Sequence, residues 1–516
     1  MEQVKVGMQQ DTIAAISTPP GVGGIAVVRV SGRDALRIVG EAWKGQPVEK
    51  MDSHTAHLGK YVATDGTLLD EAVITVFRCP NSFTGEDVAE ISVHGSRWIQ
   101  REVMADLIRR GARTAGPGEF TQRAFMNGRL DLAQAEGVVD LIASSSRAAH
   151  ALAMSQTRGH FSRGLEEVRN ELVELASLLE LELDFSEEDV EFADRERLVS
   201  LASNLIRRLD RLAASYSSGA ALKDGVPTVI AGVPNAGKSS LLNLLLGDDK
   251  AIVSDIPGTT RDTIEDTLEI EGILYRFIDT AGLRSTSDTV EGLGIERARE
   301  KMRQARIVIW IFDPTADLAS QLEEYEKFAA DNHTTQIITV VNKTDLMPGA
   351  DLRSLAGDDS RSLAGDDLLA GDAPPYSSLP TFKTGAQSEG MKLNEAVWLS
   401  AKTGAQSEGM KLNEVVWLSA KTGEGVEELM GRLRSIATDG YDPQSEFIVT
   451  NARHYEALLK GSEALRRALS GLETGLSADF IAQDIREATT HLGTITGSVT
   501  TDTLLHNIFA KFCIGK

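Results

Sequence analysis

A glycine-rich loop between an apolar strand and an apolar helix constrains this chain more than any other feature. Residues 232–239 read GVPNAGKS and fit the pattern G-x-x-x-x-G-K-[ST]. The apolar run at 228–231 precedes the loop, and the helix predicted at 239–246 follows it. In this setting backbone N–H groups surround phosphates, Lys238 adds positive charge, and the Ser239 hydroxyl can ligate magnesium. The pattern predicts a nucleoside triphosphate site in an α/β unit.

The base is selected by a second motif, NKTD at 342–345, which follows the apolar strand predicted at 336–341. A carboxylate only accepts hydrogen bonds. Asp345 can therefore accept both guanine donors, N1–H and the 2-amino group, whereas adenine offers no such pair. We expect the site to prefer GTP to ATP.

Two further motifs lie between these, GTTRD at 258–262 and DTAG at 279–282. Thr260 can complete a magnesium shell, Asp279 can hold the metal through water, and the Gly282 N–H can sense the γ-phosphate. Because these contacts need a triphosphate, hydrolysis would release both loops. Lys238, Thr260 and Asp279 are thus candidate catalytic residues, and Ser239 and Thr260 are candidate magnesium ligands.

Tandem duplications mark the chain downstream. Residues 353–359 recur at 361–367, and residues 383–401 recur at 402–420 with one difference, Ala396 against Val415. Two copies are too few for a solenoid, and the Gly, Asp, Ser and Pro content predicts a flexible surface insertion at about 348–400.

The duplication supplies the last expected base-contact motif, Ser-Ala-Lys after a strand, twice. The copies lie at 400–402 and 419–421. Only one can occupy the pocket. We favour 419–421, because residues 422–429 then open a helix, whereas the first copy runs on into the repeat.

The whole chain falls into four regions. Short β-rich runs at 25–30, 72–77 and 91–93 predict an α+β domain, apolar residues spaced three and four apart at 165–179 and 201–212 predict amphipathic helices, and helices return at 454–469 and 478–491. We therefore expect an N-terminal α+β domain, an all-α domain, and a Ras-like α/β P-loop domain inserted into it. The expected boundaries are 1–125, 126–220, 221–440 and 441–516.

Composition limits the partners. With 53 basic and 76 acidic side chains the net charge is −23, the opposite of a general nucleic-acid-binding footprint, so an RNA partner needs a local patch or another protein. Cys79 and Cys513 are too few for a disulfide framework and suggest no metal site. The sequence shows no apolar run of membrane-spanning length and no signal-peptide pattern, which predicts a cytoplasmic protein without a membrane span.

Several segments together resemble one family over nearly the whole chain, the tRNA modification GTPase family MnmE, also called TrmE. They are DTIA at 11–14, TPPGVGG at 18–24, NSFTGED at 81–87, PGEF at 117–120, LDLAQAE at 130–136 and FCIGK at 512–516. The resemblance implies a folate-binding N-terminal domain, which also forms a dimer, and a helical domain interrupted by the GTPase domain.

The resemblance also implies an activity and its partners. A homodimer would work with a flavoprotein partner of the MnmG type, which alone carries FAD, in a heterotetramer. A reduced folate, 5-formyl- or 5,10-methylene-tetrahydrofolate, would donate one carbon to C5 of the wobble uridine, U34, of certain tRNAs. The products would be 5-aminomethyl and 5-carboxymethylaminomethyl uridine. The implied folate residues are Arg29, Glu90, Arg129 and Lys516, with Arg129 standing where the family often has Lys.

For hydrolysis, the resemblance implies a potassium ion held by Asn235, Ser254, Ile256 and Thr259, and pairing of two GTPase domains. It assigns Glu291 to the attacking water, since Leu283 stands where many switch GTPases have Gln. Asn235 as a plain loop residue and Glu291 as a solvated carboxylate stay open. The residues expected to contact GTP are Asn235, Ala236, Gly237, Lys238, Ser239, Ser240, Ser254, Asp255, Ile256, Pro257, Gly258, Thr259, Thr260, Asp279, Thr280, Ala281, Gly282, Asn342, Lys343, Asp345, Ser419, Ala420 and Lys421.

The sequence leaves alternatives open. Cys513 is either a functional thiol or a structural one. The chain could instead be a ribosome-assembly GTPase that uses GTP as a timer, although such proteins usually carry a basic RNA-binding domain. A third hypothesis makes the N-terminal region a folate enzyme that the GTPase domain regulates.

Overall fold

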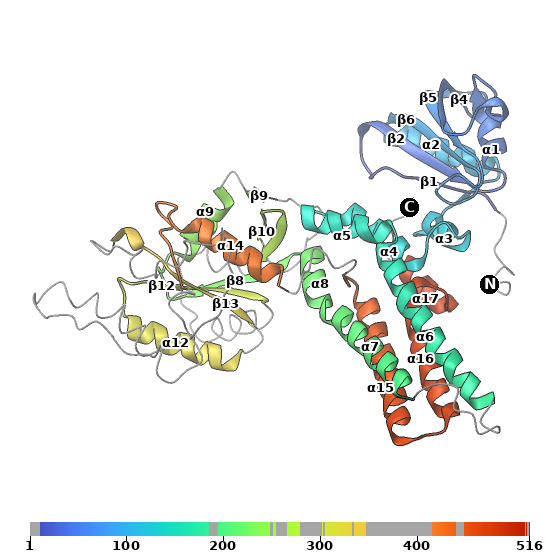
Figure 1. Ribbon diagram of the computed structural model, residues 1–516. Coiled ribbons are helices and arrows are strands. Elements are labelled where there is room, and N and C mark those ends of the chain that lie inside the picture. Colours follow the sequence, from blue (N-terminus) through green and yellow to red (C-terminus); the bar gives the residue numbers. More distant parts are fainter. Residues whose placement is uncertain are drawn as a thin grey trace, which may run out of the picture. The chain divides into compact units, whose positions relative to one another are not determined.

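The computed structural model describes residues 11–184, 195–247, 251–253, 266–278, 302, 305–332, 335–346, 415–439, 448–510, 512 and 515. These residues form two compact units. The first comprises Met1–Ser144, His150–Gly219 and Asp442–Lys516, and the second comprises Ser145–Ala149 and Ala220–Tyr441. The predicted fold class is confirmed: an α+β region, a helical domain and an inserted α/β P-loop unit (Figure 1).

The N-terminal part of the first unit is a seven-stranded sheet of order β3-β4-β5-β6-β2-β1-β7. The pairs are antiparallel except β1 with β7. The strands are β1 (Ile13–Ile16), β2 (Gly23–Ser31), β3 (Trp43–Lys44), β4 (Thr55–Val62), β5 (Leu68–Phe77), β6 (Val88–Gly95) and β7 (Arg113–Thr114). The helices are α1 (Ala35–Ala42), η2 (Val48–Lys50), α2 (Arg97–Arg109) and α3 (Glu119–Met126). The central strands β2, β5 and β6 contain the β-rich runs predicted from the sequence.

Alternation along these strands builds the core of the domain. In β5 and β6 the buried residues Ile74, Val76, Ile91 and Val93 alternate with side chains that are more exposed. This period of two is that of a sheet with one covered face. The buried face packs with α1 and α2 into one cluster.

The helical part of the first unit comprises α4 (Leu132–Ala143), α5 (Arg147–Thr157), α6 (His160–Asp184), α7 (Arg195–Ala214), α8 (Tyr216–Asp224), α15 (Ala452–Thr474), α16 (Ala478–Thr496) and α17 (Asp502–Phe509). The unit boundaries fall inside α5 and α8. The predicted apolar stripe is buried: Leu172, Leu175 and Leu209 have no exposed surface. They pack with leucines and alanines of α15 and α16, so segments on either side of the insertion share one core.

Polar contacts also join the halves of the helical domain. The Glu136 carboxylate of α4 accepts two hydrogen bonds from Arg453 of α15, both 3.0 Å, and lies 2.7 Å from His454 Nε2. Where the chain leaves and re-enters the domain, the Val449 N–H donates to Ser215 Oγ at 3.1 Å. A Cβ on Gly219 would lie 2.2 Å from the Val449 carbonyl oxygen, so the two backbones are in close contact.

The second unit is built on a sheet of order β14-β13-β12-β8-β11-β10-β9, in which β11, β8, β12, β13 and β14 are parallel. The strands are β8 (Val226–Gly232), β9 (Ala251–Val253), β10 (Asp266–Ile270), β11 (Ile273–Phe277), β12 (Ile307–Phe312), β13 (Gln336–Val341) and β14 (Val415–Trp417). The helices are α9 (Lys238–Gly247), α12 (Leu318–Asp331), η3 (Thr344–Leu346) and α14 (Val426–Ala437). Every residue of β12 is buried, as expected for a central parallel strand. Among the described residues, no helix is both long and apolar enough to cross a membrane.

Candidate functional site

The loop between β8 and α9 has the backbone conformation of an anion-binding loop. Gly232 and Gly237 have positive φ angles of 137° and 99°, and Asn235 adopts the left-handed conformation at 63°. A Cβ on Gly232 would lie 2.3 Å from the Ile311 carbonyl oxygen, so only glycine fits beside β12. Such turns direct successive backbone N–H groups into one concavity, and the N-terminus of α9 adds N–H groups without intrahelical acceptors. The loop therefore suits phosphate oxygens.

Lys238 is the first residue of α9. Its Nζ donates to the carbonyl oxygens of Gly232 and Val233, at 2.6 and 2.8 Å. Desolvation lowers the pKa of the ammonium, against a smaller opposing effect of Glu324. These bonds hold the ammonium beside the loop, where its remaining N–H can reach a phosphate oxygen.

Asn342 follows β13 and connects the phosphate loop to the base-contact loop. Its Nδ2 donates to the Ala236 carbonyl at 2.8 Å, and its Oδ1 accepts from the Ala420 N–H at 2.9 Å. The residue is 2% exposed. A Cβ on Gly237 would lie only 2.1 Å from Asn342 Nδ2, so the loop and the amide fit without space between them.

The base-contact loop in this arrangement is the second duplicated copy. Strand β14 pairs with β13 in parallel, with Val341 opposite Trp417, and delivers Ser419 and Ala420 beside Asn342 and Asp345. Ser419 is fully buried, and its hydroxyl donates to Asp345 Oδ1 at 2.8 Å. The copy at 400–402 lies outside the described residues.

One residue of the site was missed from the sequence. Asp313 follows β12, and its Oδ2 lies 2.6 Å from Lys343 Nζ. Desolvation raises the pKa of Asp313, but hydrogen bonds from Lys343 and Thr315 outweigh it and the pKa is lowered. The signal was available, since Asp313 ends an apolar strand as Asn342 does, and such ends meet at one edge of a parallel sheet.

Of the other predicted nucleotide-site residues, Ser240 lies in α9 and Lys421 follows Ala420, whereas twelve lie outside the described residues. They are Ser254, Asp255, Ile256, Pro257, Gly258, Thr259, Thr260, Asp279, Thr280, Ala281, Gly282 and Glu291. Among the predicted magnesium ligands, Ser239 is the second residue of α9, one position after Lys238. Within the described ranges, no group of three His, Cys, Asp or Glu side chains could hold a metal. A hydroxyl at this position fits magnesium, which is usually bound through one or two protein groups, substrate phosphates and water.

The predicted folate residues Arg29 and Glu90 face each other on β2 and β6. Arg29 Nη2 lies 2.7 Å from Glu90 Oε1, and both side chains are partly exposed. The guanidinium also lies over two aromatic rings, 5.5 Å from the centroid of Phe83 and 5.6 Å from that of Phe120. This arrangement offers charge and flat apolar surface together.

Arg129 lines a hollow that the Phe83 ring also borders. A hollow of about 490 Å³ is lined by His54, Phe77, Asn81, Ser82, Phe83 and Arg129. Phe83 thus borders this hollow and also contacts Arg29. Aromatic faces with an arginine match a ligand that has a flat ring system and carboxylates.

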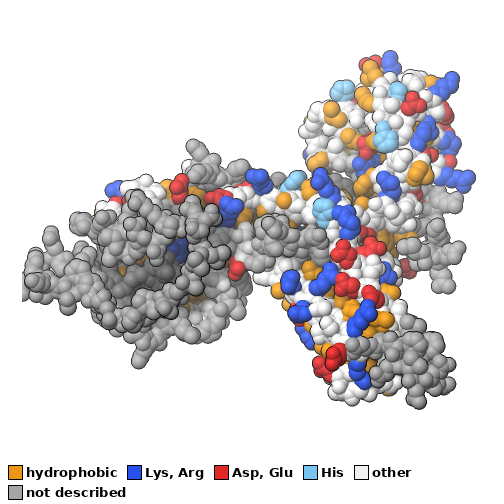
Figure 2. Space-filling view, in the orientation of Figure 1, with side chains coloured by type: hydrophobic (Ala, Val, Ile, Leu, Met, Phe, Trp, Pro, Cys, Tyr) orange, Lys and Arg blue, Asp and Glu red, His pale blue; other side chains and the backbone are white. Residues whose placement is uncertain are grey.

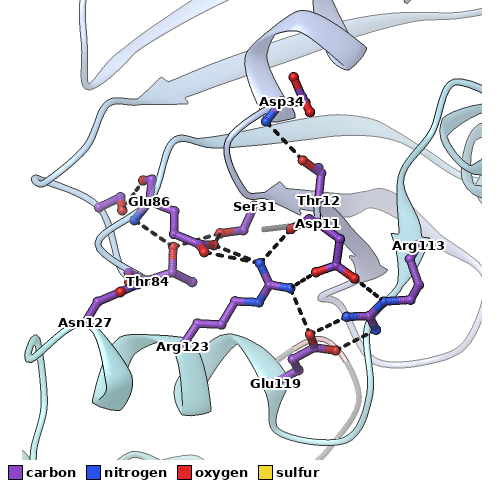
Figure 3. A network of polar contacts seen from close by, with 11 residues as sticks. Asp11, Thr12, Ser31, Asp34, Thr84, Glu86, Arg113, Glu119, Arg123 and Asn127 are labelled. Atoms are coloured by element: carbon purple, nitrogen blue, oxygen red, sulfur yellow. Dashed lines mark hydrogen bonds and ion pairs between the residues drawn. The ribbon is translucent and has the colours of Figure 1, made fainter. Parts of the chain in front are cut away.

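A polar network holds the loop that carries Phe83 (Figure 3). Ser31 donates to Glu86 Oε2 at 2.7 Å, Arg123 Nη1 donates to Glu86 Oε1 at 3.2 Å, and Asn127 Nδ2 donates to the Thr84 carbonyl at 2.8 Å. Arg123 is also bonded to Asp11 and Glu119. Three of the motifs noted in the sequence, at 11–14, 81–87 and 117–120, therefore meet at Arg123 and its partners.

The C-terminal tail reaches the same domain. The Ser17 hydroxyl donates to the Gly515 carbonyl at 3.1 Å, and a Cβ on Gly515 would lie 2.4 Å from the Ile16 carbonyl oxygen. Phe512 is buried and contacts Gly118. Because β1 pairs with β2, the tail lies one strand away from Arg29. Cys513 and Lys516 lie outside the described residues.

Comparison with known proteins gives matches over the whole chain. The model "GTP-binding protein TrmE N-terminus" matches residues 12–129, and "MnmE helical domain" matches residues 132–513. The tRNA modification GTPase MnmE of Parabacteroides distasonis is 46% identical over 98% of this chain and 100% of that protein. The one from Cytophaga hutchinsonii is 44% identical over 100% of both. Among solved structures, the G domain of the T. maritima FeoB iron transporter is 21% identical and covers 41% of this chain and 98% of its own, with a TM-score of 0.24.

The parallel sheet, its phosphate loop and the base-contact loop at its edge define a P-loop GTPase. The full-length relatives identify it more closely. The chain belongs to the tRNA modification GTPase family MnmE.

Proposed function

We propose that this GTPase acts in modification of the wobble uridine of certain tRNAs. With a flavoprotein partner and a reduced folate as one-carbon donor, it forms 5-aminomethyl and 5-carboxymethylaminomethyl uridine. The ribosome-assembly alternative is set aside because the chain matches a tRNA modification family over its full length.

The observation that carries this proposal is the docking of the C-terminal tail at the end of β1, the strand that pairs with the Arg29 strand β2. Ser17 binds Gly515, and Phe512 fills the space against Gly118. Lys516 follows Gly515 directly in the sequence, and the family resemblance assigns it to the same site. Arg29, Glu90, Arg129 and Lys516 then hold the folate, with the Phe83 ring as a flat apolar surface. Cys513 stays a candidate thiol of this site.

For hydrolysis, Lys238 would contact the phosphates, Thr260 and Asp279 would hold the magnesium ion, and Glu291 would orient or activate the attacking water. Potassium, bound by Asn235 and the loop at 254–259, would neutralise charge that develops between the β- and γ-phosphates. The left-handed Asn235 lies within the phosphate loop itself, which supports its place in this set. Pairing of two GTPase domains would complete the site.

Mass spectrometry of wobble uridines tests the function. Cells that lack the protein should accumulate tRNA without the aminomethyl groups, and the intact gene should restore them. An unchanged modification pattern in those cells would contradict the proposal. GTPase rates in potassium and sodium chloride at equal ionic strength test the cation, and equal rates would remove it from the mechanism.

A further inference from the structure

The turn between α5 and α6 lies in the longest stretch of the sequence without an acidic side chain. Residues 141–165 contain no Asp or Glu, although the net charge of the protein is −23. In the first unit this stretch presents His150, Arg158, His160 and Arg163, all four exposed. Figure 2 shows Lys or Arg side chains together with His side chains over α5 and the start of α6, and acidic side chains further along.

The two arginines of this turn differ from those of the neighbouring helices. On α15 the exposed Arg466 pairs with Asp210 at 2.6 Å, and Arg467 pairs with Asp484 at 2.9 Å. Arg158 and Arg163 have no carboxylate partner among the residues that the structure describes. Arg163 Nη1 instead donates to the Arg158 carbonyl at 3.3 Å, which keeps the two residues on one turn. Their charge is available to a partner.

The turn is also held in place by a motif that neither the GTP site nor the folate site uses. In LDLAQAE at 130–136, Asp131 and Gln134 form a capping box at the start of α4. Gln134 Nε2 then donates to the Thr157 carbonyl at 3.2 Å. Next to it, Gln156 Nε2 donates to the Ala133 carbonyl at 2.8 Å. These bonds fasten the end of α5 to α4, so the basic side chains project from a fixed backbone.

We propose that this surface, defined by His150, Arg158, His160 and Arg163, binds the phosphate backbone of tRNA. Exposed, unneutralised arginines on a fixed turn are what phosphate contacts require, and the start of α6 adds the positive end of a helix dipole. The remainder of α6 carries Glu166, Glu167, Glu171 and Glu174, which repel a polyanion and limit the contact to this end. The inference rests on the proposed function, because it takes tRNA as the substrate.

The test measures binding of the full-length protein to an in vitro transcribed tRNA with uridine at the wobble position, over a series of salt concentrations. Arg158→Gln/Arg163→Gln should weaken binding about tenfold near physiological salt and reduce the salt slope by about two, one per lost phosphate contact. The matched control is Arg466→Gln/Arg467→Gln, which changes the net charge equally at arginines that carboxylates already neutralise. The control should bind as the unaltered protein does, and all three should hydrolyse GTP at the same rate.

Three results would overturn the proposal: unchanged affinity and salt slope in the double variant, an equal loss in the control, or no measurable tRNA binding by the unaltered protein. A fourth would do so as well, namely that the double variant keeps its tRNA binding but no longer binds a partner protein. The last would make the turn a protein-binding face. Failure of the proposed function is separate, because it would appear as unchanged wobble uridines in cells lacking the protein whatever the binding assay gives.

Discussion

Single side chains connect parts of the nucleotide site that lie far apart in the sequence. Asn342 bonds to Ala236 and Ala420, which precede and follow it by 106 and 78 positions. Asn342 therefore contributes more to the nucleotide site than a single contact with the base would. A change on either side of this amide should alter both loops.

Gly237→Ala tests the closeness of that fit. The new Cβ would lie 2.1 Å from Asn342 Nδ2, at a φ of 99° that L side chains rarely adopt. We expect GTP affinity to fall by about 100-fold or more, since the loop must open or the amide must leave. Gly247→Ala at the end of α9 has open space around it and should bind GTP normally. Nucleotide titration by fluorescence measures both, and normal binding by Gly237→Ala would show that the loop adapts freely.

Asp345→Asn tests the base preference. An amide cannot accept from both guanine donors, so GTP affinity should fall about 10- to 100-fold, the ~1.5–3 kcal/mol of hydrogen bonds to a charged group. Xanthosine triphosphate, which has an oxygen in place of the 2-amino group, should gain affinity. Asp317→Asn changes an exposed helix cap and should leave both affinities unchanged. If the unaltered protein bound ATP as well as GTP, Asp345 would not select the base.

Strands and helices of the parallel sheet could be predicted from the sequence because their signals are local. Strand β13 has the bounds that the apolar run predicted, and the phosphate loop lies between β8 and α9 as expected. The network around Arg123 could not be predicted, because it depends on β1, the loop at 81–87 and α3 meeting in space. Those segments are motifs in the sequence, but their side chains acquire partners only once the sheet forms. Strands β1, β4 and β7 were missed because short or half-exposed strands carry a weak pattern.

Strand β14 allows a direct test of the duplicated copies, because their serines stand in nearly identical sequence. Ser419→Ala removes the hydrogen bond to Asp345 and should weaken GTP binding about 3- to 10-fold, in line with ~0.5–1.5 kcal/mol for one hydrogen bond. Ser400→Ala makes the same change in the other copy and should have no effect. The opposite pattern would place the first copy in the pocket.

Glu136 of α4 forms a largely buried ion pair with Arg453 and His454. Glu136→Gln would leave Arg453 and His454 without their carboxylate, and we expect a loss of about 3–5 kcal/mol in the free energy of unfolding. Glu487→Gln removes an exposed partner of Arg467 and should leave the free energy of unfolding nearly unchanged, because solvent screens this ion pair. Urea unfolding followed by helical circular dichroism compares the two variants. Equal losses of unfolding free energy in the two variants would mean that burial does not make the Glu136 ion pair more stabilising than an exposed one.

The same carboxylate predicts a pH dependence. Desolvation raises the pKa of Glu136, but His454 and Arg453 outweigh it and lower the pKa to about 2. The stabilisation is therefore complete above the ordinary glutamate pKa of about 4.3 and is lost as the pH falls towards 2. The difference in unfolding free energy between the unaltered protein and Glu136→Gln should shrink over this range. A constant difference would contradict the assignment.

At the level of the whole chain, the α+β, helical and inserted α/β architecture followed from changes in periodicity along the sequence. The placement of the tail did not. Ser17 and Gly515 are 498 positions apart, and nothing in either segment alone indicates the other. Only the resemblance to a family links Arg29 with Lys516, which lies outside the described residues.

Removal of the last four residues tests that placement. A chain that ends at Phe512 keeps the buried ring against Gly118 but loses Gly515 and Lys516. We expect binding of 5-formyl-tetrahydrofolate to be lost and GTP hydrolysis to be retained, since the tail contacts only the first unit among the described residues. Calorimetric titration measures the first and phosphate release the second. Undiminished folate affinity would remove the tail from the site.

The bond between Val449 and Ser215 has a consequence for how this gene can change. The helices of the helical domain are held together at Ser215 and Val449, where the chain leaves this domain and returns to it. The number of residues between these two points therefore does not change how the helices pack. Loop closure depends only weakly on length, so inserted codons there carry little penalty. The tandem repeats at 353–367 and 383–420 are inheritable length changes of this kind. Lineages of this family should therefore vary in length mainly inside the inserted unit, while the span from Leu132 to Ser215 stays constant.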